Sequence, residues 1–118
     1  MKLSEAMEKG FGMTWPTRET YYERLGGDSH SCALGAAVIG VVGLEAAEDM
    51  CGMEFRQRLH ENFPVTSKEV PKEISDKSEL KAFEGNVATF IMALNDFTDM
   101  SRHHIKALVK RMEDEYDV

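Results

Sequence analysis

Residues 29–40 decide the fold of this chain, and they run Ser29-His30-Ser31-Cys32-Ala33-Leu34-Gly35-Ala36-Ala37-Val38-Ile39-Gly40. Serines precede an uncharged series of small and apolar residues, which predicts a helix over 32–43 capped by Ser29 or Ser31. The series is apolar on every side of the helical wheel. We therefore expect the helix to be buried on every side.

Three glycines in this segment support a packing role. Gly35, Gly40 and Gly43 each cost up to about 1 kcal/mol of helix propensity. Such a loss is tolerable where neighbouring backbones approach the helix closely. The sequence therefore predicts that this helix is the packing centre of the domain.

The chain before the central helix predicts one short helix and one ribbon. Ser4 is expected to cap a helix over 5–9, which Gly10 ends. Aromatic residues at 20–23, followed by a Gly-Gly pair, favour a short β-hairpin near 20–31. The eight methionines and the single tryptophan, Trp15, are expected to fill the core.

The chain after the central helix predicts more helices. We expect a helical piece over 44–50, a helix over 53–62, a polar loop over 65–78, an amphipathic helix over 80–95, and a helix over 101–115 capped by Ser101. The last two should wrap the central helix. The prediction is thus a mainly α, compact helical bundle forming a single domain over 1–118, with a small-residue helix at its centre.

The composition narrows the functional classes. The chain has 118 residues, of which 42% are hydrophobic and 30% charged, as in globular proteins. Its formal net charge of −7 disfavours nucleic-acid and anionic-membrane partners. The longest uncharged stretch, 29–44, is shorter than the roughly 18 apolar residues of a membrane span, and residues 1–6 do not resemble a secretory signal. A cytoplasmic protein with two reduced cysteines is expected.

Cys32 with His30 is the candidate catalytic pair. Backbone N–H groups at a helix start stabilise a thiolate, and an imidazole lies two residues away. The competing interpretation is a small buried cysteine that only packs, because cysteine is among the most buried residue types. Motifs typical of cysteine proteases or of serine hydrolases do not accompany Cys32.

Neither a metal nor a cofactor is expected. Cysteines and histidines at 30, 32, 51, 60, 103 and 104 do not have the spacing of metal ligands. No glycine pattern that follows a strand is present to hold a phosphate.

Two polar segments are candidate binding residues. Asn95 and Asp96 are either turn formers or a patch that recognises a partner. In the last helix Arg102, His103 and His104 begin a basic face that continues to Arg111, which would suit a helix-turn-helix that binds DNA. Acidic residues from Glu113 onward follow this face at once, so a solvated surface is the simpler interpretation.

Several segments resemble a family of small bacterial and phage proteins to which no activity is assigned. The resemblance rests on Leu3-Ser4-Glu5-Ala6 with Gly10, Ser31-Cys32-Ala33-Leu34-Gly35-Ala36-Ala37, Leu94-Asn95-Asp96, and Ser101-Arg102 with Ile105 and Val109. It implies a compact, mainly helical accessory domain encoded by a bacterium, phage or prophage, and it implies no catalytic residues.

The sequence thus predicts a small non-enzymatic interaction or regulatory protein whose partner is another protein. An acidic surface suits a basic partner. The alternatives are a thiol-dependent enzyme or redox regulator that uses Cys32 with His30, and a DNA-binding protein that uses the helix over 101–112.

Overall fold

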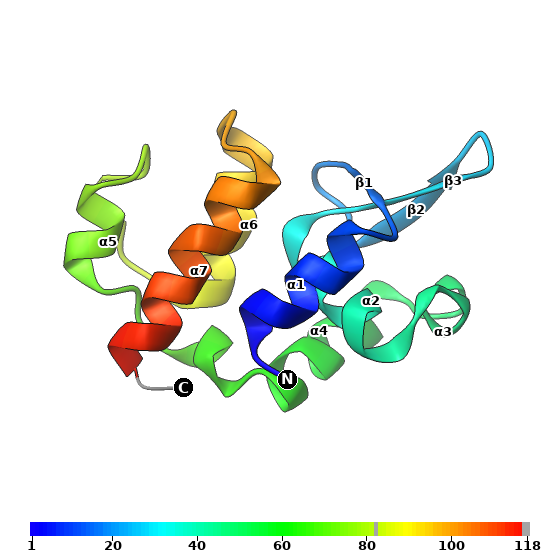
Figure 1. Ribbon diagram of the computed structural model, residues 1–118, viewed down its shortest axis with the longest axis horizontal. Coiled ribbons are helices and arrows are strands. Elements are labelled where there is room, and N and C mark those ends of the chain that lie inside the picture. Colours follow the sequence, from blue (N-terminus) through cyan, green and yellow to red (C-terminus); the bar gives the residue numbers. More distant parts are fainter. Residues whose placement is uncertain (82, 117–118) are drawn as a thin grey trace.

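A buried helix of small residues, α2 (Ala33–Val42), lies at the centre of the computed structural model (Figure 1). The structure describes residues 1–81 and 83–116; Ala82, which falls inside the helix predicted over 80–95, and residues 117–118 lie outside the described residues. The cap of α2 is Cys32, and the expected serine caps were wrong. Ser29 and Ser31 belong to a strand, so the backbone stays extended until Cys32.

Helix α1 (Leu3–Phe11) is the principal neighbour of α2. A side chain at Gly10 would collide with the backbone of Ala36, with its Cβ 2.8 Å from the Ala36 Cα. A side chain at Gly40 would collide with the backbone of Ala6, with its Cβ 2.9 Å from the Ala6 carbonyl carbon. The two helices therefore touch backbone to backbone at two points. The expectation that residues 80–95 and 101–115 wrap α2 omitted this helix.

The other two glycines of the central segment have different roles. Gly35 faces the backbone of Tyr21, where an added Cβ would lie 2.7 Å from the carbonyl carbon. Gly43 has open space around it and a φ of +88°, and it ends α2. Close packing thus explains Gly35 and Gly40, whereas Gly43 supplies a backbone conformation that other residues rarely adopt.

A three-stranded sheet covers one end of α2. The strands are β1 (Trp15–Pro16), β2 (Tyr22–Leu25) and β3 (Asp28–Ser31), in the order β1-β3-β2. Strands β2 and β3 form the predicted hairpin, closed by Gly26 and Gly27, whose φ values of +60° and +90° suit a tight two-residue turn. Strand β1 pairs parallel to β3 and was not predicted.

The remaining helices complete a mainly α fold, as predicted. They are α3 (Leu44–Glu48), α4 (Gly52–Asn62), the 3-10 helix η1 (Pro64–Ser67), α5 (Lys72–Asp76), α6 (Val87–Phe97) and α7 (Arg102–Tyr116). Helix α7 packs on α1 and α6, so it reaches α2 mainly through them.

Three of the predicted boundaries were wrong. Helix α1 spans Leu3–Phe11 and not 5–9, because Gly10 packs against Ala36 within the helix and Gly12 stands at its end. The predicted loop over 65–78 contains η1 and α5, because Val65 and Ile74 anchor these short turns in the core. Helix α6 begins at Val87 and not near 80. The Asn86 side chain accepts a hydrogen bond from the Thr89 N–H at 2.8 Å and so caps the helix start.

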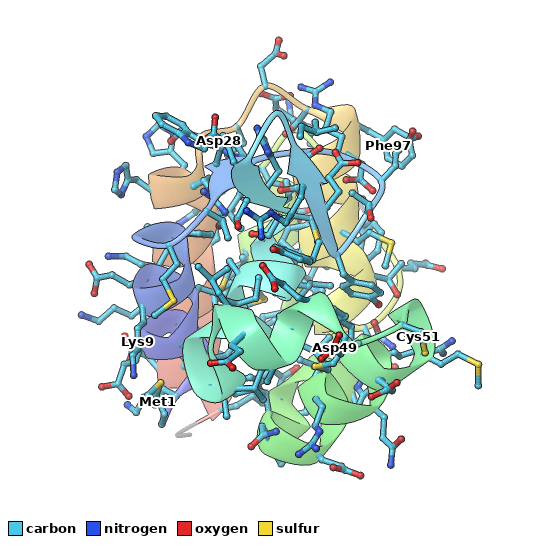
Figure 2. The ribbon with its side chains drawn as sticks, turned by 90° about the vertical axis from the view of Figure 1, so that its right-hand side faces the viewer. Met1, Lys9, Asp28, Asp49, Cys51 and Phe97 are labelled. Atoms are coloured by element: carbon cyan, nitrogen blue, oxygen red, sulfur yellow. The ribbon has the colours of Figure 1, made fainter. Side chains whose placement is uncertain are left out.

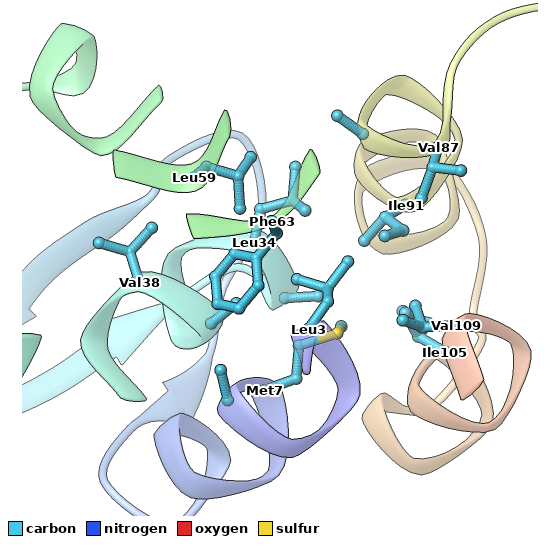
Figure 3. Packing of buried hydrophobic residues seen from close by; sticks show 14 of the residues in the cluster. Leu3, Met7, Leu34, Val38, Leu59, Phe63, Val87, Ile91, Ile105 and Val109 are labelled. Carbon is cyan, nitrogen blue, oxygen red and sulfur yellow. The ribbon is translucent and has the colours of Figure 1, made fainter. Parts of the chain in front are cut away.

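The hydrophobic core is built around α1 and α2, and every other helix contributes at least one buried side chain to it. Figure 3 shows side chains from α1, α2, α6 and α7, together with Leu59 of α4 and Phe63 just after it, converging on one volume. Met7 and Met112 are fully buried, but Met1, Met53 and Met92 are exposed, and Trp15 is 62% exposed. The prediction that the methionines and Trp15 fill the core was therefore wrong for Trp15 and for these three methionines.

One carboxylate is buried at the start of α1. Glu113 of α7 is 2% exposed, and it accepts hydrogen bonds from the Ser4 hydroxyl and, at 3.3 Å, from the Ser4 N–H. Lys2 is the residue at the helix cap, so the expectation that Ser4 caps α1 was wrong. Ser4 lies inside the first turn, where free N–H groups favour a negative charge.

The backbone contacts between α1 and α2 predict a sharp difference between two glycine substitutions. Gly40→Ala is expected to lower the free energy of unfolding by about 3 kcal/mol, because the new methyl group meets the Ala6 backbone. Gly52→Ala, at a helical position with open space, should leave stability unchanged or raise it by up to about 1 kcal/mol. Urea denaturation of both variants measures this, and equal stabilities would contradict the close contact.

Candidate functional site

The Cys32 thiol is enclosed at the start of α2. Its side chain is 6% exposed, and its Sγ accepts a hydrogen bond from the Gly35 N–H at 3.3 Å. Burial, together with a smaller effect of the nearby Asp96 charge, raises the pKa of this thiol to about 11, although hydrogen bonds from backbone N–H groups oppose both effects. The protonated thiol therefore predominates at neutral pH, which favours the packing role.

The candidate base, His30, is directed elsewhere. His30 lies on β3, and its Nδ1 is 3.3 Å from the Asp28 carbonyl oxygen. Within residues 1–81 and 83–116, no hydrogen bond joins His30 to Cys32. The structure thus provides neither the thiolate nor the thiol–imidazole contact that nucleophilic catalysis needs.

Asn95 joins three segments at the end of α6. Its Oδ1 accepts from the Ala33 N–H at 3.1 Å, which satisfies a free donor at the start of α2. Its Nδ2 donates to the Thr17 carbonyl oxygen at 2.9 Å and to Asp96 Oδ1 at 2.8 Å. Asp96 in turn accepts from the Glu19 N–H at 3.0 Å. These two candidate binding residues are engaged in holding the loop after β1.

Arg102 makes a second connection beside the first. Its Nη1 donates to the Thr14 carbonyl oxygen at 2.7 Å, and its Nη2 lies 3.0 Å from both the Thr14 and Ser31 hydroxyl oxygens. The guanidinium also stacks over the Phe11 ring, 4.2 Å from its centre. Burial lowers the pKa of Arg102 to about 10, so it remains cationic at neutral pH. We call this group of Arg102, Phe11, Thr14 and Ser31 the arginine clamp.

The two histidines that follow do not join the clamp. His103 and His104 are exposed in the first turn of α7, where Ser101 caps the helix by accepting from the His104 N–H at 3.2 Å. The predicted group of five binding residues is therefore divided, with Asn95, Asp96 and Arg102 turned to the interior and the two histidines to the surface.

The basic face of α7 is also partly used within the fold. Arg102 belongs to the clamp, and Lys106 Nζ pairs with Glu8 Oε1 of α1 at 2.9 Å. This pairing lowers the pKa of Glu8. A helix that reads DNA needs its first turns free to enter the major groove. These contacts therefore weaken the DNA-binding alternative.

Trp15 is the surface feature that the sequence interpretation missed. The sheet register places Trp15, His30 and Glu23 in one row across β1, β3 and β2, on the face opposite to the buried Ser31. Thr14, the neighbour of Trp15, turns inward to the arginine clamp. Because side chains alternate along an extended chain, Trp15 then points outward. Its place directly before a proline was the available signal for an extended backbone.

The negative charge of the chain is concentrated at one end of the molecule. Residues 19–54 contain seven acidic side chains against one basic side chain, Arg24, and so carry nearly all of the net charge of −7. Their acids are Glu19, Glu23, Asp28, Glu45, Glu48, Asp49 and Glu54. The hairpin and α3 lie beside each other, and Figure 2 faces this end, with Asp28 at the hairpin and Asp49 after α3. We call the hairpin together with residues 44–49 the acidic end.

No protein-family model, curated protein or solved structure matches the chain. Within the described part of the chain, no helix has both the length and the apolar character needed to span a membrane. The same residues contain no group of three or more histidines, cysteines or acids arranged to hold a metal ion.

The arginine clamp predicts a large stability effect at a polar residue. Arg102→Ala is expected to lower the free energy of unfolding by about 2–4 kcal/mol, since the Thr14 carbonyl oxygen and the two hydroxyl groups lose a charged donor in a buried site. Arg102→Lys should recover less than half of this loss, because an ammonium cannot reproduce the planar fork. Chemical denaturation measures both, with the exposed Arg111→Ala as a control within about 0.5 kcal/mol of wild type.

Thiol accessibility distinguishes the two cysteines. At pH 8 a maleimide should label the exposed Cys51 in the native protein and reach Cys32 only after denaturation. Above pH 9 the unfolded chain loses the Cys32 proton while the folded chain keeps it until about pH 11. The free energy of unfolding should therefore fall across this range, and less so in Cys32→Ala. Rapid native labelling of Cys32 would restore the catalytic interpretation.

Proposed function

We propose that this protein is a small non-enzymatic interaction or regulatory protein, encoded by a bacterium or phage, that binds a basic partner protein through its acidic end. The observation that carries this proposal is the concentration of charge: five acids and one arginine in the hairpin and residues 44–49. Charge of one sign on one end steers an oppositely charged partner and orients its approach.

The acidic end remains negative after its internal pairings are counted. Arg24 Nη1 bonds to Glu48 Oε1 at 2.6 Å, so the single base of this segment is neutralised by one acid. Glu45, Asp49 and Asp28 are exposed. Charges exposed in this way interact at long range and are screened by salt. Binding that depends on them should weaken as the salt concentration rises.

Apolar side chains accompany these charges. Leu25 at the end of β2, Val41 near the end of α2, and Met53 at the start of α4 are all exposed, Met53 by 83%. An interface needs such side chains at its centre, because exposed ion pairs alone contribute little to affinity. Charges surrounding isolated apolar contacts are the arrangement expected of a reversible protein interface.

Other features of the chain are consistent with this proposal. Both cysteines are free, as a reducing cytoplasm would keep them. The resemblance to small bacterial and phage proteins supports an accessory role. A catalytic role for Cys32 would require an exposed thiolate, and its burial argues for packing.

Charge reversal tests the proposal. Purified protein immobilised at low salt is expected to retain a basic protein from a native lysate. Glu45→Lys with Asp49→Lys should reduce this retention at least tenfold, because the change inverts the local field. Glu73→Lys with Glu79→Lys, an equal charge change away from the acidic end, should leave retention nearly unchanged. Quantitative mass spectrometry of the retained proteins measures all three.

Three outcomes would contradict the proposal. These are recovery of no partner at low salt, retention that both double variants reduce equally, and a retained partner whose binding does not respond to salt. Circular dichroism of each variant confirms that the fold is unchanged, because all four positions are exposed.

A further inference from the structure

We propose that the outer face of the sheet, formed by Trp15, His30 and Glu23 with Thr17 and Leu25, is a docking site for an arginine-bearing segment of the basic partner. This inference rests on the proposed function and names the chemistry of one contact within it. The five residues come from β1, β2, β3 and the residue directly after β1. They form one surface because the central strand β3 pairs with both of the other strands.

Hydrogen bonding fixes which residues share this face. The Thr17 hydroxyl donates to Glu23 Oε1 at 2.8 Å, so these two side chains meet on one side of the sheet. Trp15 precedes Thr17 by two residues, and Leu25 follows Glu23 by two residues, so both lie on the same side. Trp15 and Leu25 are 62% and 52% exposed. The exposed indole of Trp15 and the carboxylate of Glu23 therefore lie on one face of the sheet, on either side of His30.

The chemistry of this pair selects a guanidinium. An arginine side chain stacks on an aromatic face through its planar group and donates a pair of hydrogen bonds to a carboxylate. Tryptophan is the strongest of the aromatic partners for a cation. Glu23 uses one oxygen for Thr17, and a carboxylate has about four acceptor positions, so it retains capacity for a donor from the partner.

Three arginines lie near the sheet, and each is bonded away from this face. Arg18, directly after Thr17, donates to the Thr98 carbonyl oxygen at 3.0 Å and pairs with Asp99. Arg102 lies on the inner side, where it bonds to Thr14 and Ser31. Arg24 lies between Glu23 and Leu25 in β2, so its side chain points to the other side of the sheet. It pairs there with Glu48 of α3. Asp28 adds an exposed acid in the position opposite Leu25. Within the part of the chain that the structure describes, the outer face therefore carries carboxylates and one imidazole, His30, and no lysine or arginine, which complements a cationic segment.

The arginine clamp holds this face in position. Arg102 bonds to the Thr14 carbonyl oxygen directly before Trp15 and to Ser31 directly after His30. Arg102 thus links the two strands that carry Trp15 and His30 on the inner side of the sheet. Because the surface is ordered before binding, the partner does not have to order it.

Trp15 provides its own signal, because it is the only tryptophan of the chain. We expect its fluorescence to change and saturate when the protein is titrated at low salt with an unstructured peptide of six arginines spaced by glycine and serine. A matched peptide with lysine in place of arginine should bind about fivefold more weakly, since it lacks the planar stacking. Glu23→Gln should weaken arginine-peptide binding about threefold to tenfold, whereas Glu73→Gln should not.

Calorimetry with Trp15→Ala completes the experiment, and circular dichroism confirms that this exposed substitution leaves the fold intact. Loss of arginine preference in Trp15→Ala supports the proposal. The proposal is overturned if the peptide does not bind, if it binds without changing Trp15 fluorescence, or if arginine and lysine peptides bind equally. If a partner protein is still retained through Glu45 and Asp49 in any of these cases, the proposed function stands and only the sheet contact fails.

Discussion

The contact of α1 with α2 is the constraint on which the rest of the structure depends. Two helices whose backbones touch need glycine on each side, and here Gly10 meets Ala36 while Gly40 meets Ala6. The close approach brings Leu3 and Met7 into the core next to Leu34 and Val38, as Figure 3 shows. It also places the end of α1 beside the start of α2, so the intervening chain must turn back within about twenty residues. The residues between the two helices form the small three-stranded sheet.

The polar connections at that end complete the arrangement. Asn95 bonds to Ala33 and Thr17, and Arg102 bonds to Thr14 and Ser31, so neighbouring residues of α6 and α7 hold both strands of the parallel pair. Buried hydrogen bonds to a charged group contribute more than neutral ones, and they are costly when one partner is removed. The segments around residues 10, 31–37, 95 and 102 therefore meet in space.

Local patterns predicted the parts of this fold that local forces determine. Helices α2 and α7 follow from apolar spacing and end residues, and the hairpin follows from its Gly-Gly turn. The start of α6 was missed because Leu80 and Phe83 continue the apolar spacing while the Asn86 cap decides the boundary. The Asn95 bonds and the arginine clamp were not predictable, because Asn95 lies 62 residues from Ala33 and Arg102 lies 88 from Thr14. The exposure of Trp15 depends on strand register, which its residue type does not reveal.

Pro16 gives the sheet a further property. The Thr17 N–H points to β3, where it bonds to the Ser31 carbonyl oxygen at 3.0 Å, so the nitrogen of Pro16 points away from β3. Since proline has no N–H, this free border of the sheet lacks the donor that an incoming strand would need. The same border is only two residues long, which further discourages pairing with a second chain or growth into an aggregate. Addition of a strand at the β1 border is therefore disfavoured.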